Sequence, residues 1–155
     1  MDLHEIYTSL IAEHSRSTAH RHHLDCPDIV KAGVNPSCGD EISLEIKLDG
    51  DILADLAFTG EGCAISQAST SMMIDLLKGK TLEEARRLID LFLAMIKREI
   101  TDEDELEALD EAMALQNVSN MPARVKCAVL AWHTLEKATE SSEARPPKRP
   151  GSQKE

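Results

Sequence analysis

The stretch ISLEIKLDGDILADLAF, residues 42–58, alternates apolar and polar side chains on both sides of a central Asp49-Gly50 pair. Before the pair, every second residue is apolar. The same period continues after it in Ile52, Ala54, Leu56 and Phe58. A period of two is typical of strands buried on one face, and Asp-Gly between two such strands favours a type I′ turn. The stretch therefore predicts an antiparallel β-hairpin.

Helical patterns flank this hairpin, and one more strand is expected before it, over Asp28–Val34. Thr81-Leu82-Glu83-Glu84 is a capping box, in which side chains satisfy backbone N–H groups at the start of a helix. Helices are expected over residues 3–14, from Cys63 to Gly79, from Thr81 to about Ile96, from about Asp104, and from Pro122 onward.

The chain has 155 residues, enough for one domain with a substantial core and too few for two. We expect this domain to span residues 1–140. Aromatic residues make up only 3% of the chain, so the core must be mainly aliphatic. Residues 141–155 combine Pro146-Pro147 and Pro150-Gly151 with basic residues, and this composition predicts a disordered, basic, proline-rich tail.

The charge of the chain excludes one class of partner. The formal net charge is −11, and without the tail it is −13. Nucleic-acid binding needs clustered Lys and Arg to replace counterions on the phosphates, so no nucleic-acid partner is expected. No apolar stretch reaches the length of a membrane span, and the polar N-terminus lacks the features of a signal peptide. We therefore expect a cytoplasmic protein without a membrane partner.

Three short peptides contain the residues best suited to bind a metal ion. They are NPSCGD (residues 35–40), GEGC (60–63) and MPARVKC (121–127), which contribute Cys38, Asp40, Cys63 and Cys127. Thiolates and a carboxylate are suitable ligands for a four-coordinate ion. Cys63 and Cys127 are both expected near helix N-termini, whose positive partial charge lowers the pKa of a thiol.

Two other interpretations of these cysteines exist. Disulfides are disfavoured because cytosolic thiols stay reduced and a chain of this size has a core of its own. Ordinary buried cysteines, which act as small apolar residues, are as compatible with the spacing as metal ligands are. Spacing alone therefore does not show that the three peptides meet.

Three thiolates and one carboxylate around a divalent ion would carry a net charge of −2, which two helix N-termini and Arg124 could offset. Such a donor set suits zinc, and a thiol-rich set also suits iron–sulfur chemistry. Purely structural zinc sites more usually have four cysteines, or three cysteines and a histidine. The carboxylate therefore indicates a site whose coordination changes.

Two further clusters have weaker functional interpretations. His20, His22, His23 and Cys26 could form a second metal site, but a histidine-rich loop of this kind is more often solvated, with Cys26 as a spare thiol. The acidic segment 102–111 could bind a cation or a basic partner. A solvated helix face is favoured instead, packed through Leu106, Leu109 and Met113.

The three peptides together resemble the U-type iron–sulfur cluster assembly proteins (the IscU/NifU N-terminal type), and in particular the SufU branch. The resemblance runs from Ile6 to about Lys137 and includes Leu48-Asp49-Gly50 and the Ser/Met-rich segment after Cys63. The fold that it implies is α/β (α+β), with a small antiparallel three-stranded sheet packed against about five helices. The metal site would lie at one exposed end.

The resemblance also implies a function. Cys38, Asp40, Cys63 and Cys127 would bind Zn²⁺, Cys38 would accept sulfur, and Arg124 would support the site. The sulfur donor would be a persulfide on a pyridoxal-phosphate-dependent cysteine desulfurase of the SufS type, and the Suf scaffold complex is a candidate acceptor downstream. Whether such a zinc-dependent sulfurtransferase acts as an enzyme is open. The alternatives are a scaffold that binds iron as a transient 2Fe–2S cluster on the same ligands, and a structural zinc adaptor.

Two departures from the IscU scaffolds favour the SufU branch. Those scaffolds have a histidine directly before the last cysteine and a Leu-Pro-Pro-Val-Lys chaperone motif. This chain has Lys126 directly before Cys127, and Met121-Pro122-Ala123-Arg124 in place of the chaperone motif. It also has an additional acidic segment before Cys127, which is similar to SufU.

Overall fold

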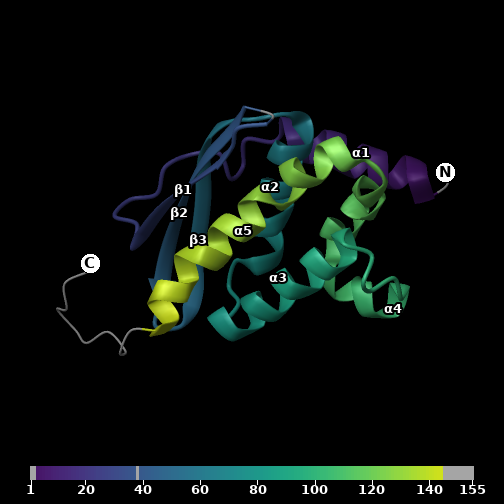
Figure 1. The fold of residues 1–155 in the computed structure, drawn as a ribbon. Coiled ribbons are helices and arrows are strands. Elements are labelled where there is room, and N and C mark those ends of the chain that lie inside the picture. The colour runs from purple at the N-terminus through teal and green to yellow at the C-terminus, as the bar shows by residue number, and fades with distance from the viewer. Residues whose placement is uncertain (1–2, 38, 145–155) are drawn as a thin grey trace.

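The computed structural model describes residues 3–37 and 39–144, with side chains for residues 5–37 and 39–140. A three-stranded antiparallel sheet with the order β1-β2-β3 packs against a layer of helices (Figure 1). The fold is thus the predicted α+β arrangement. Its elements are α1 (Leu3–Arg16), β1 (Ile29–Asn35), β2 (Asp40–Asp49), β3 (Ile52–Glu61), α2 (Ala64–Leu77), α3 (Leu82–Ile96), α4 (Glu103–Leu106), the 3₁₀ helix η1 (Glu107–Asn120) and α5 (Pro122–Ala144).

The predicted hairpin forms, but its turn differs from the prediction. Asp49 pairs with Ile52, so the turn is centred on Gly50 and Asp51. Within this turn only Gly50 has a positive φ, of 64°. A type I′ turn needs positive φ at both central residues, so that part of the prediction is wrong.

An irregularity in β3 changes which side chains point inward. Lys47 pairs with Asp55 while Leu48 pairs with Leu53, so Ala54 is an extra residue on β3. A bulge of this kind shifts the alternation by one residue. Leu53 is therefore fully buried, whereas Ile52 and Ala54, predicted to face the core, are exposed.

The core is mainly aliphatic, as expected, and Trp132 is its largest buried side chain. Its ring is fully buried and stacks on that of Phe92, with centroids 3.9 Å apart. The indole N–H donates to the hydroxyl of Ser69 over 2.8 Å, and that hydroxyl donates to the carbonyl of Ala128 over 2.6 Å. The polar atoms of this cluster are thus satisfied, and it joins α2, α3 and α5.

The helix predicted from about Asp104 is a different structure. One turn of α-helix, α4, continues into the 3₁₀ helix η1 with a kink at Asp110 (φ 53°, ψ −131°). The spacing of the buried residues explains the difference, because a period of three matches the 3₁₀ helix. The residues with this spacing are Leu106, Leu109, Ala112, Leu115 and Val118, and Ala114 is buried outside the period. Met113, also predicted to face inward, is half-buried.

The last helix starts at Pro122, as predicted, and continues to Ala144. It therefore extends four residues past the point where we expected the tail to begin. Residues 145–155, the rest of the predicted tail, lie outside the described residues. None of the described helices is both long enough and apolar enough to cross a bilayer.

Candidate metal centre

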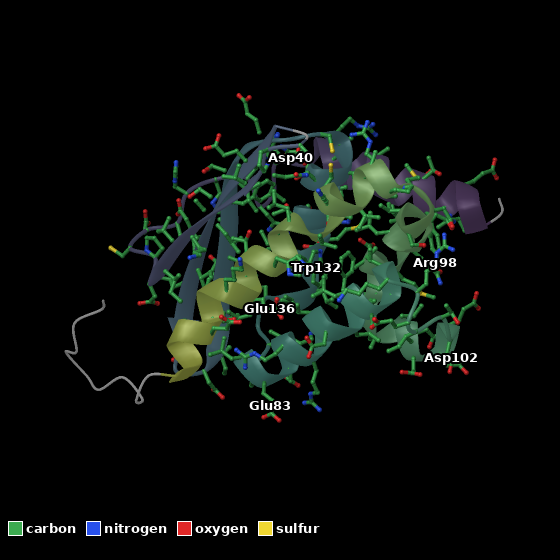
Figure 2. All side chains as sticks on the ribbon, viewed as in Figure 1. Asp40, Glu83, Arg98, Asp102, Trp132 and Glu136 are labelled. Carbon is green, nitrogen blue, oxygen red and sulfur yellow. The ribbon has the colours of Figure 1, made fainter. Side chains whose placement is uncertain are left out.

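Three elements meet at one end of the sheet and bring together three of the predicted ligands. Asp40 is the first residue of β2, Cys63 immediately precedes α2, and Cys127 lies in the second turn of α5. One donor atom from each of these side chains lies within 4.8 Å of the others. Figure 2 shows Asp40 at this end of the sheet. The chain segments are distant in sequence, but the fold gives them a common site.

The carboxylate of Asp40 is fully buried, and its two oxygens have different surroundings. Oδ1 accepts a hydrogen bond of 2.9 Å from the backbone N–H of Cys63. Oδ2 has no hydrogen-bond partner among the described residues. A buried oxygen without a partner is unfavourable. A cation bound between this oxygen and the two thiols would satisfy it, so the residues present fit a metal ion.

Cys63 is positioned by the start of α2. It is the N-cap residue, and its Sγ accepts a hydrogen bond from the N–H of Ser66 over 3.5 Å. A Cβ on Gly62 would lie 3.0 Å from Asp40 Oδ1, so a residue without a side chain lets the backbone pass close to the carboxylate. The thiol of Cys63 therefore lies at the N-terminus of α2, next to the carboxylate of Asp40.

Cys127 is almost completely buried, and the amide of Asn35 lies beside it. Asn35 Nδ2 donates to Cys127 Sγ over 3.9 Å. Our sequence analysis did not identify Asn35 as part of the site, although it is the first residue of the NPSCGD peptide. The field of a helix dipole falls off after the first turn. Cys127 lies in the second turn of α5, so this field is weaker at its sulfur than at that of Cys63, the N-cap of α2.

A positive charge lies next to both thiols. A hydrogen bond with Cys127, together with the negative charges of Cys63 and Cys127, raises the pKa of Arg124 above its usual value. The guanidinium, which belongs to an exposed residue in the first turn of α5, thus places a positive charge beside both sulfurs. This interaction offsets part of the negative charge of the donor set.

Cys38 lies outside the described residues. In the sequence it falls between Asn35 and Asp40, which face each other as the last pair of the β1–β2 ladder. Its predicted roles as ligand and sulfur acceptor therefore remain predictions.

The histidine-rich loop does not join this centre. His23 Nδ1 lies 2.6 Å from Glu45 Oε2, His20 bonds to Asp75 three helical turns along α2 from Cys63, and Cys26 is exposed. Burial opposes ionisation of Glu45, but hydrogen bonds from the N–H of Leu24 and from His23 outweigh it and lower the pKa of Glu45. Among the described residues, His22, His23 and Cys26 belong to no cluster of three potential ligands. These contacts hold the loop on β2 and α2.

The fold is a small α+β domain with a candidate metal-binding donor set at one end of its sheet, and it matches a known family. The family description "NifU-like N terminal domain" matches residues 6–148. The chain belongs to this family, the IscU/SufU group of iron–sulfur cluster assembly proteins.

Individual relatives carry two different names. The chain is 42% identical over 142 residues to the zinc-dependent sulfurtransferase SufU of Bacillus subtilis, with 92% of this chain and 95% of that protein covered. It is 41% identical over 140 residues to the iron–sulfur cluster assembly scaffold protein IscU of Streptococcus pyogenes, with coverage of 90% and 86%.

Solved structures agree with this family. A SUF-system scaffold protein from Fervidobacterium islandicum AW-1 superposes with a TM-score of 0.80 at 39% identity, covering 88% of this chain and 98% of that one. The N-terminal part of a NifU-like protein from Brucella abortus shares the fold at 22% identity, with a TM-score of 0.79 and coverage of 92% and 97%.

Proposed function

We propose that this protein accepts sulfur from the persulfide of a cysteine desulfurase and passes it on during iron–sulfur cluster assembly. Zinc would be held by Asp40, Cys63, Cys127 and Cys38. The observation that supports this most directly is the group of two thiols and one carboxylate, in which Asp40 Oδ2 has no hydrogen-bond partner among the described residues. The name of the Bacillus subtilis relative supports zinc and sulfur transfer.

The donors suit zinc in number and in kind. Two thiols and one carboxylate are present among the described residues, and Cys38 would supply the fourth donor. When bound, zinc would keep the thiols deprotonated at neutral pH, where a free thiol with a pKa of about 8.5 is mostly protonated.

The sulfur-transfer step is assigned to Cys38. Its thiolate would attack the outer sulfur of the desulfurase persulfide. The new S–S bond forms on Cys38 while the old S–S bond breaks, and the desulfurase cysteine leaves as a thiolate. No oxidant or reductant is consumed, because one persulfide replaces another.

The surrounding residues would prepare the site for this step. Arg124 places a positive charge beside the thiols and would stabilise the negative charge that accumulates there. The N–H of Cys63 holds Asp40 in place. Asn35 donates to the sulfur of Cys127 and fixes its orientation.

The scaffold function is the second candidate, since the IscU of Streptococcus pyogenes is about as similar as SufU. The residue before Cys127 favours sulfur transfer, because Lys126 is exposed and stands where the IscU scaffolds have a histidine. The acidic stretch that we compared with the SufU branch lies in α4 and η1.

One experiment separates the candidates. Alanine release by a SufS-type desulfurase would be measured with and without the reduced, zinc-loaded protein. We expect stimulation by the wild type, loss of stimulation in Cys38→Ala, and normal stimulation in Cys26→Ala, because Cys26 is exposed and away from the centre. Unchanged turnover with Cys38→Ala would instead indicate a structural zinc adaptor. Little zinc after purification, with a stable chromophore after anaerobic reconstitution, would indicate a scaffold.

A further inference from the structure

A second group of metal-ligand side chains lies where α1, α2 and η1 meet. It consists of His14 in the last turn of α1, Asp75 in α2 and Glu111 in η1. One donor atom from each lies within 4.8 Å of the others. None of the three belongs to the thiol centre, and our sequence analysis did not bring them together.

His14 is the anchor of this group. The residue is 8% exposed, and its ring is fixed from both sides. Nδ1 lies 2.8 Å from the hydroxyl of Ser71, while Nε2 lies 2.7 Å from Glu111 Oε1 and 3.8 Å from Asp75 Oδ2. A histidine that ligates a metal through one nitrogen usually has the other nitrogen hydrogen-bonded to the protein. The contact with Ser71 provides this arrangement.

A second imidazole extends the group. His20 Nε2 lies 2.5 Å from Asp75 Oδ1, the oxygen on the other side of the carboxylate from His14. The side chain of His20 is only 15% exposed, and its carbonyl accepts a hydrogen bond from the N–H of Phe58. Two imidazoles and two carboxylates thus form one continuous cluster.

The charges of this cluster allow two neutral states. Two carboxylates close together are balanced either by protons on both imidazoles or by one divalent cation with both imidazoles neutral. The carboxyl side chains of Asp75 and Glu111 are about half exposed, at 50% and 48%, so an ion can reach them from solvent. Ligands about 2.1 Å from a tetrahedral ion lie roughly 3.4 Å apart, within the spread of these donor atoms.

We propose that His14, Asp75 and Glu111 bind a divalent first-row transition ion, with His20 holding Asp75 from its other carboxylate oxygen. Nitrogen and oxygen donors suit Fe²⁺, Zn²⁺ or Mn²⁺, whereas the thiol centre suits thiophilic ions. The bound ion would join α1 to α2 and η1. This second site has no role in the proposed sulfur transfer.

Cobalt(II) tests the proposal because its spectrum distinguishes the two sites. Cobalt bound to thiolates gives intense sulfur-to-metal charge-transfer bands, and cobalt bound only to nitrogen and oxygen does not. We expect the full-length reduced protein to bind two equivalents, the thiol centre with charge-transfer bands and the histidine–carboxylate cluster without them. Glu111→Gln and Asp75→Asn should each lose the second equivalent and keep the charge-transfer bands.

The control is another histidine–carboxylate pair, which belongs to no cluster of three potential ligands among the described residues. His133 Nδ1 lies 3.3 Å from Glu136 Oε1 on α5, and Glu136→Gln should leave both equivalents intact. Binding of one equivalent by the wild type, or retention of two by Glu111→Gln, would overturn the proposal. Asp75 and Glu111 are half exposed, so both variants are expected to fold, and circular dichroism would verify this.

Discussion

The two carboxylate oxygens of Asp40 have different partners, and this difference determines the effect of a substitution. Asparagine keeps an oxygen that can accept the N–H of Cys63 and removes the negative charge of the buried group. We therefore expect Asp40→Asn to weaken zinc binding and to lower stimulation of the desulfurase. The metal-free variant should be at least as stable as metal-free wild type, because an unpartnered buried carboxylate oxygen is unfavourable.

Zinc content after dialysis and melting temperatures with and without chelator would test this expectation for Asp40→Asn. Glu41→Gln is a matched control, because it neutralises an exposed acid at the next position of β2. Zinc affinity equal to wild type in Asp40→Asn would show that the carboxylate is not a ligand.

The side chain of Asn35 contacts the candidate centre through the sulfur of Cys127. Residues that hold a ligand in place typically change metal affinity by about 10–100-fold when removed. We expect Asn35→Ala to lower zinc affinity by this amount, measured by competition with a chromogenic chelator. Asn117→Ala, an exposed amide in η1, should have no effect. Equal affinities for the two variants would contradict a role for Asn35.

The sequence indicated the candidate ligands more readily than the residues that contact them. Cys63 and Asp40 stand in short glycine-containing peptides whose chemistry is visible locally. The contact of Asn35 with Cys127 joins residues 92 positions apart, and no local pattern encodes it. The pairing of His14 with Glu111 likewise depends on how two helices cross.

Among the elements, β1 and α5 approach each other closely at Gly33. A Cβ at this position would lie 2.1 Å from Thr134 Oγ1 and 3.2 Å from Thr134 Cβ. We expect Gly33→Ala to lower the free energy of unfolding by about 1–3 kcal/mol, the usual effect of overpacking. Urea denaturation would measure it.

A double variant checks the cause. Thr134→Ala removes the oxygen that the new Cβ would meet, so Gly33→Ala should be less destabilising in that background than in wild type. Fully additive effects would show that the destabilisation has another origin.

Local patterns predicted the presence of the hairpin and of α3 correctly. They did not predict the bulge in β3 or the helix type of η1. The alternation over residues 42–58 gave the hairpin, and Thr81 caps α3 through the predicted reciprocal bonds with Glu84. The bulge at Ala54 was missed because it depends on pairing with β2 and not on the composition of β3. The 3₁₀ helix η1 was missed because Leu106 at the end of α4 and Leu109 and Met113 in η1 also fit an α-helical stripe.

At the scale of the whole molecule, the candidate metal centre takes its donors from β2, the start of α2, and α5, at one end of the sheet. An ion that binds only the folded state stabilises it, by about 2.7 kcal/mol at a free concentration 100 times the dissociation constant. We therefore expect chelation of zinc to lower the melting temperature, and added zinc to restore it.

Calorimetry with and without chelator would measure this stabilisation. Cys26→Ser should respond as the wild type does, because its thiol is exposed and away from the centre. Identical melting curves in zinc and in chelator would contradict a metal held jointly by the three elements.

The proximity of Asp40, Cys63 and Cys127 could not be predicted from the composition of the chain or from its hydrophobic period. It depends on β2, α2 and α5 having their starts at the same end of the molecule, which is a property of the topology. The resemblance to a known family supplied what the spacing of the cysteines alone left open.

The stacked pair of Trp132 and Phe92 has a practical consequence for all these measurements. Trp132 is the single tryptophan of the chain and is shielded completely from water. Its fluorescence should therefore be blue-shifted in the native protein and should move to longer wavelength only when the interior opens. Loss of an ion can then be followed by absorbance, and loss of the fold by emission, in the same cuvette.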